Sequence, residues 1–197
     1  MKLHLNNVRI SFANGIFHAT ALQEGQTPKY GADFILQPDS VVLEVKPDGT
    51  KVKTTLAAAE LAVANEAWKG KGAQMLKTLE ASKKAIRDGD LRVNKSGDVY
   101  EGYEGNTYVT AKNTARPLVI GRDRAPLTED DGVIYSGCIV NAIVEIYANT
   151  VPAKKGVFAE LKGVQFWADA DAFGGGGTAR ADEFDEATEG ATADDFA

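Results

Sequence analysis

The distribution of strand and helix patterns along the chain is the feature that most limits its fold. Near-alternating apolar residues occur early, in KLHLNNVRISF and, after a Thr-Pro break, in KYGADFIL. Four later runs, which start at Thr107, are rich in Val, Ile, Tyr and Phe: TYVTAKN, PLVIG, VIYSGCIVNAIVEIYAN and GVFAELKGVQFWAD. We therefore expect five or more strands, divided into an early and a late group.

The segment between the two groups has the composition of helices. TTLAAAELAVANEAWKG consists largely of helix formers between a threonine start and a glycine stop, with apolar residues at helical spacing (Leu56, Ala59, Val63 and Ala67). GAQMLKTLEASKKAIRDGD predicts a second helix that ends at the Asp88-Gly89 turn. The pattern predicts a helical insertion over about residues 54–87.

These elements favour a mainly β fold with inserted helices, namely an OB-fold-like barrel of five or more strands. A mixed α+β sheet is the alternative. The length of 197 residues suits one hydrophobic core rather than two. We expect one domain over residues 1–173, followed at 174–197 by a glycine linker and a tail.

The tail has a charge unlike that of the rest of the chain. Residues 178–197 contain seven of the 28 acidic residues and one of the 22 basic residues, which leaves 21 of each in residues 1–177. The acidic pI of the whole chain therefore describes the tail, and the body is neutral. We expect this tail to be disordered.

The sequence offers little for catalysis or metal binding. The two histidines, His4 and His18, lack the spacing of a metal motif, and the one cysteine, Cys138, is expected to be a buried strand residue. We expect no cofactor and no metal. The longest apolar runs fall short of 18 residues, so we expect no membrane association. A single cysteine excludes an intramolecular disulfide framework, so we expect a reducing, cytoplasmic location.

Bases and aromatic residues alternate between residues 68 and 124. Twelve basic and seven acidic residues lie there, a local excess of five positive charges in a body that is neutral as a whole. Single-stranded nucleic acid requires cations along its phosphates and flat rings beside its bases, and this segment supplies both. The alternative is a solvated helix face followed by a tyrosine-rich strand.

The stretch NTYVTAKNTARPLVIGRDRAPLTEDDGVIYSGCIVNAIVEIYAN resembles a family of phage and prophage single-stranded-DNA-binding proteins, similar in fold to that of the T-odd podophages. AIRDGD, GVFAELKGVQFW and DAFGGGG extend the likeness. The resemblance implies an OB-fold with an inserted helix and sequence-tolerant binding of single-stranded DNA in phage replication or recombination. It also implies an acidic tail that contacts replication proteins.

Within the matching positions, we predict DNA contacts from chemistry. The cations would neutralise phosphates and the rings would stack on bases. The predicted DNA-binding residues are Trp68, Lys83, Lys84, Arg87, Tyr100, Tyr103, Tyr108, Lys112, Arg116, Arg122 and Arg124. The arginines of NTARP and GRDRAP have an alternative role in a pair of turns, and strand tyrosines are often core residues.

The tail is predicted to act in two ways. Its carboxylates would compete with DNA for the cationic surface, and once displaced the tail would bind a phage or host replication or recombination protein. The predicted tail contacts are Asp182, Glu183, Phe184, Asp185, Glu186, Asp194, Asp195 and Phe196. Many tails of this kind end on phenylalanine, whereas here Ala197 follows Phe196. The alternative is a solubilising end without a partner.

Two other classes of protein stay open. An interaction or assembly module would use the tail without binding nucleic acid. A metal-dependent nuclease would need clustered carboxylates, for which Asp88, Asp90 and Asp123 are the candidates. We expect no chemical step. The sequence is compatible with a homo-oligomer.

Overall fold

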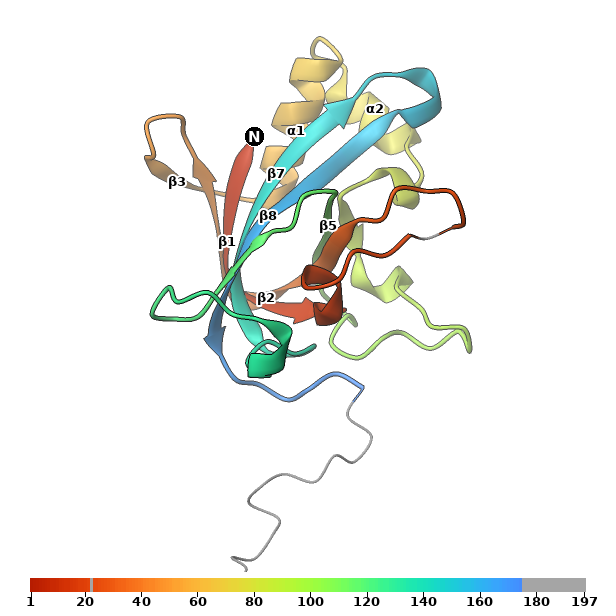
Figure 1. The fold of residues 1–197 in the computed structure, drawn as a ribbon. Coiled ribbons are helices and arrows are strands. Elements are labelled where there is room, and N and C mark those ends of the chain that lie inside the picture. The colour runs from red at the N-terminus through yellow and green to blue at the C-terminus, as the bar shows by residue number, and fades with distance from the viewer. Residues whose placement is uncertain (22, 175–197) are drawn as a thin grey trace, which may run out of the picture.

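The computed structural model describes residues 1–21 and 23–174, in which the longest strands close into a barrel (Figure 1). The barrel strands are β1 (Lys2–Ser11), β2 (Tyr30–Val45), β5 (Thr107–Asn113), β7 (Ile139–Asn149) and β8 (Gly156–Ala168). Their order around the barrel is β1-β2-β5-β8-β7 and back to β1. All neighbours are antiparallel except β5 and β8. This confirms the predicted OB-fold-like barrel.

Three short strands extend the barrel. They are β3 (Lys51–Thr54), which forms a hairpin with β2, β4 (Ile86–Asp88), which pairs with β5, and β6 (Leu118–Ile120), which runs parallel to β8. The sequence did not predict β3 or β4. The C-terminal residues from 175 onward, which contain most of the predicted linker and the acidic tail, lie outside the described residues.

The helical insertion is shorter than predicted. It consists of α1 (Leu56–Ala67) and α2 (Gly72–Thr78). The second predicted helix, which was to end at the Asp88-Gly89 turn, is therefore wrong beyond Thr78. Its last residues become β4, where Ile86 lies opposite Val109 of β5. Strand pairing satisfies the backbone there and overrides the local helix propensity. No helix in the described part of the chain is long and apolar enough to span a membrane.

Local sequence explains where α1 begins and which side it buries. The Thr55 hydroxyl accepts a 3.1 Å hydrogen bond from the Ala58 amide, as expected of an N-cap residue. Leu56, Ala59 and Val63 then bury one side of the helix. α1 and α2 lie together next to β7 and β8 (Figure 1).

The barrel interior contains the apolar residues of the alternating runs. They include Leu3, Leu5, Val8, Ile10, Phe34, Val109, Val140, Val144, Ile146 and Leu161, all fully buried. Cys138 is also fully buried, but it precedes β7 and is not part of it. Burial raises the pKa of this thiol to about 11.

Candidate nucleic-acid interface

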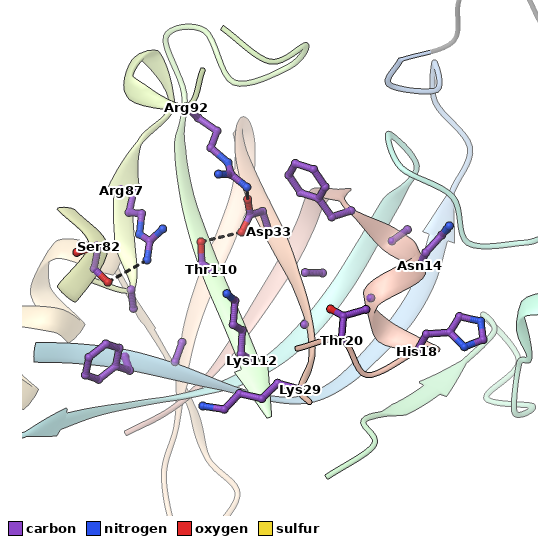
Figure 2. A pocket seen from close by; sticks show the side chains of 18 of the residues that line it. Asn14, His18, Thr20, Lys29, Asp33, Ser82, Arg87, Arg92, Thr110 and Lys112 are labelled. Carbon is purple, nitrogen blue, oxygen red and sulfur yellow. Dashed lines mark hydrogen bonds and ion pairs between the residues drawn. The ribbon is translucent and has the colours of Figure 1, made fainter. Parts of the chain in front are cut away.

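A groove of about 900 Å³ opens over β2 and β5. One wall is the short helical turn Ala13–Ile16 with the loop that follows it, and the other is formed by residues 82–92 (Figure 2). The turn packs tightly on β2, because a Cβ at Gly15 would overlap the Gly31 carbonyl oxygen. The wall formed by Ala13–Ile16 therefore lies directly against β2, although it is distant in sequence from residues 82–92.

Five cationic side chains from separate segments line this groove: Lys29, Lys84, Arg87, Arg92 and Lys112. Strand pairing brings several of them together. Lys112 lies opposite Gly31 on β2, and Arg87 lies opposite Tyr108 on β5. The Arg87 guanidinium also donates a 2.8 Å hydrogen bond to the Lys84 carbonyl, which fixes its direction. The cations are held in place by the fold rather than by one local motif.

Asp33 is the one acidic residue among the described residues that line the groove, and its charge is compensated. Its carboxylate is 3% exposed and accepts hydrogen bonds from the hydroxyls of Tyr103 (2.9 Å) and Thr110 (2.7 Å). The Arg92 guanidinium lies 3.3 Å from it (Figure 2). A fully partnered, buried carboxylate presents little negative charge to a ligand. The accessible lining is therefore positive.

The pKa of Lys112 reflects this excess of positive charge. Partial withdrawal from water lowers its pKa, and Arg87, Lys29 and Arg92 lower it further, against the opposing effect of Asp33. These cations repel one another in the free protein, and an anion bound among them would lower this repulsion. The groove is thus suited to a polyanion.

Exposed aromatic rings accompany the cations. Phe12 is 41% exposed, the Arg92 guanidinium lies 4.9 Å from its ring centroid, and Tyr100 meets it edge-on at 5.6 Å. Tyr147 is 39% exposed and pairs with Phe158 at 5.9 Å between centroids. Phe12, Tyr147 and Phe158 all line the groove. The site therefore combines cations with rings accessible to a flat ligand.

The structure brings three of the eleven predicted DNA-binding residues into the groove: Lys84, Arg87 and Lys112. Lys83, the neighbour of Lys84, is half-buried and does not line the groove. Tyr100 is half-buried and reaches the groove only through its contact with Phe12.

Two of the predicted stacking residues need correction. Tyr103 has no exposed surface and Tyr108 is 3% exposed, and their rings meet edge-on at 4.9 Å. A ring that water cannot reach cannot stack on a base, so both are core residues. Trp68 is half-buried against the hydrophobic core beside α1 and does not line the groove.

The three predicted arginines around β6 lie elsewhere. Arg116, Arg122 and Arg124 are exposed on the loops before and after β6, and none of them lines the groove. Arg122 instead lies 5.4 Å from the ring centroid of Trp167 on β8. The structure therefore separates these arginines from Lys84, Arg87 and Lys112.

Sequence analysis missed Phe12, Lys29, Tyr147 and Phe158 as groove residues. They lie outside the segment 68–124, and only the closure of β2 on β5 and the β7–β8 hairpin bring them to it. Arg92 lies within that segment but carried no distinguishing local signal. The aromatic residues Tyr147 and Phe158, on either side of the turn between β7 and β8, are the sequence feature that could have suggested this end of the groove.

The acids proposed for a nuclease have structural roles in turns. The Asp88 carboxylate accepts the Asp90 amide at 3.0 Å, and that of Asp123 accepts the Ala125 amide at 3.0 Å. Asp90 accepts the Gly105 amide at 2.6 Å. Over residues 1–21 and 23–174, no group of three or more His, Cys, Asp or Glu is placed to hold a metal ion.

Comparisons with known proteins agree with the barrel and extend over nearly the whole chain. A family model described as the single-stranded-DNA-binding protein of Enterobacter phage Enc34 matches residues 1–197. Putative protein p50 of Acyrthosiphon pisum secondary endosymbiont phage 1 is 39% identical over 189 residues, which cover 94% of each chain.

Two solved structures have a similar fold. The single-stranded-DNA-binding protein of bacteriophage Enc34, in complex with single-stranded DNA, has a TM-score of 0.63 at 20% identity over 88% of this chain and 89% of that one. A second structure of the single-stranded-DNA-binding protein of bacteriophage Enc34 has a TM-score of 0.62 at 20% identity, over 93% of this chain and 90% of that one. The family match over residues 1–197 shows that the chain belongs to the family of the Enc34 phage single-stranded-DNA-binding protein.

Proposed function

We propose that this protein binds single-stranded DNA in the groove over β2 and β5, with little sequence preference and without a chemical step. The observation that carries the proposal is the composition of the groove: five cations, one compensated carboxylate and exposed rings. Membership of the Enc34 family supports the same ligand. The protein would act in phage DNA replication or recombination in the cytoplasm of the bacterial host.

The groove fits a single strand better than other polyanions. Phosphates would lie between the cations and release their counterions, so the affinity would fall steeply with salt. Phe12, Tyr147 and Phe158 would stack on unpaired bases, and since every base has a π-face, stacking confers little sequence preference. A duplex does not offer its base faces to these rings. The combination therefore favours single strands.

The acidic tail would regulate this groove. Residues 178–197 contain seven carboxylates on the same chain as the five groove cations, so they would compete with DNA at high effective concentration. DNA would displace them and free Phe184 and Phe196 to bind a replication or recombination protein. The charge pattern of the sequence supports this part of the proposal.

A fluorescence anisotropy titration tests the proposal. A labelled single-stranded oligonucleotide is titrated with the whole chain, and with a chain that ends after Gly177, at several salt concentrations. We expect salt-sensitive binding by both proteins, with tighter binding by the shorter one. Equal affinities would contradict the competing tail, and the absence of binding at low salt would contradict the proposed function.

A further inference from the structure

The loops around β6 form a second basic surface with an exposed tryptophan, here called the Trp167 surface and consisting of Arg116, Arg122, Arg124 and Trp167. None of these residues lines the groove. In Figure 1 the green segment that follows β6 lies beside the blue end of β8, in agreement with the pairing of Ile120 with Gln165. This pairing brings Arg122, two residues after Ile120, close to Trp167 near the end of β8.

Trp167 is unusually accessible for a strand tryptophan. Its side chain is 44% exposed, and the Arg122 guanidinium lies 5.4 Å from its ring centroid. The cation holds the indole near one orientation while leaving much of the ring uncovered. An exposed, oriented ring beside a cation is the arrangement that a base and its phosphate require.

The three arginines are free to bind an anion. Over residues 1–21 and 23–174, none of their side chains forms an ion pair or a hydrogen bond. Asp123 is the acid between two of them, and its carboxylate is engaged by the Ala125 amide at 3.0 Å. Three arginines against the one acid Asp123 leave this surface with a positive excess.

The turn that carries Arg122 and Arg124 is fixed in a strained form. Arg124 has a φ of 69°, a left-handed value that is uncommon outside glycine. The Gly121 amide bonds the Ala125 carbonyl at 2.8 Å, and the Gln165 side chain donates to the Gly121 carbonyl at 3.3 Å. Backbone strain held in place by surrounding bonds is characteristic of binding sites. These contacts fix the backbone of the turn that carries Arg122, whose guanidinium lies beside Trp167.

We propose that the Trp167 surface is a second binding site for single-stranded nucleic acid, separate from the groove. A base would stack on the exposed face of Trp167 while Arg122 and Arg124 bind the adjacent phosphates. The class of ligand rests on the proposed function of the groove. The acidic turn Glu129–Asp131 lies in the loop between the arginine turn and Ser136, which lines the groove. Its Glu129 pairs with His18, which lines the groove, so negative charge adjoins the groove on the side of this loop and the two sites act as separate contacts.

Tryptophan fluorescence tests this directly, because the chain contains only Trp68 and Trp167. In a Trp68→Phe variant, Trp167 is the sole reporter, and we expect an oligothymidylate of about six nucleotides to lower its emission about twofold by stacking. Adding Arg122→Ala should raise the oligonucleotide concentration at the midpoint of this quenching by about threefold to tenfold. Lys53→Ala on β3, which also removes one exposed cation, should leave the midpoint unchanged. If Trp68→Phe does not fold, the Trp167→Phe variant serves instead, and should lose the quenching that the natural chain shows.

Anisotropy of a labelled oligonucleotide, measured on the same samples, separates the two proposals. Binding without any change in Trp167 emission would overturn the second site and leave the groove function intact. No binding in either measurement would overturn both. Loss of the quenching in a Lys29→Ala/Lys112→Ala groove variant would show that Trp167 responds only to the groove, and would also overturn the second site. A change in Trp167 emission on removal of residues 178–197, with no further response to DNA, would assign the surface to the acidic tail instead.

Discussion

The Tyr103 hydroxyl donates a 2.9 Å hydrogen bond to the Asp33 carboxylate beneath the groove. Asp33 in turn lies 3.3 Å from the Arg92 guanidinium, which is placed over the ring of Phe12. Burial and the neighbouring Asp33 carboxylate raise the pKa of Tyr103, so the phenol stays protonated as the donor. A buried core tyrosine thus stabilises the carboxylate that holds a groove arginine.

Removing this hydroxyl should lower stability. In Tyr103→Phe the buried carboxylate loses one of its partners, and we expect the free energy of unfolding to fall by about 1.5–3 kcal/mol, as for hydrogen bonds to charged groups. Urea unfolding followed by circular dichroism measures it. Tyr30→Phe is the control, since the Tyr30 hydroxyl has no hydrogen bond within the described residues. Equal stability of the two variants would show that the bond contributes nothing.

Tyr147→Ala should weaken DNA binding without unfolding the protein. Loss of an exposed ring that stacks on a base costs about 1–3 kcal/mol of binding free energy, equivalent to a rise in Kd of about fivefold to 150-fold. Tyr108→Phe, at a buried ring, should change the Kd by less than about twofold. Anisotropy titrations of the two variants measure both effects. An unchanged Kd for Tyr147→Ala would contradict the stacking role of this ring.

Cys138 predicts a pH dependence of stability. Its pKa is about 11 in the folded chain against an ordinary 9.0, so the unfolded thiol ionises first as the pH rises. The unfolded state then binds fewer protons, and the free energy of unfolding falls between about pH 9 and 11, by up to about 3 kcal/mol from this group. Cys138→Ala should remove this part of the decline when urea unfolding is compared at pH 8 and pH 10. The same decline in both proteins would assign it to other groups.

The strands with clear alternation were predictable from sequence because each has one face in the barrel. β5 begins and ends where the pattern TYVTAKN does, and β8 follows GVFAELKGVQFWA. The second helix was overestimated because residues 79–88 have helical periodicity, whereas Ile86–Asp88 pair with β5 as a strand. Periodicity shows which residues suit a helix, but it does not show which tertiary pairing competes with it.

The groove was predictable only in part. The alternation of TYVTAKN predicts that Tyr108 and Val109 point to opposite faces of β5. It does not predict that Tyr103 and Phe173 cover the face on which Tyr108 lies. Lys112 lies at the end of the same strand, beyond this cover, and lines the groove. Lys29 and Tyr147 join it through long-range strand pairing, which a local pattern of bases and rings does not contain. The resemblance therefore predicted the family, whereas the local pattern of bases and rings contained only part of the groove.

The salt dependence of binding tests the central claim most directly. Lys29→Ala/Lys112→Ala removes two groove cations, whereas the matched control Lys2→Ala/Lys53→Ala removes two exposed lysines that do not line the groove. If both groove lysines bind phosphates, the slope of log K against log salt should become shallower by about 1.4, from about 0.7 per phosphate on single strands. The control should keep the slope of the natural chain. The same slope in all three proteins, or a shallower slope only in the control, would contradict the assignment of DNA to this groove.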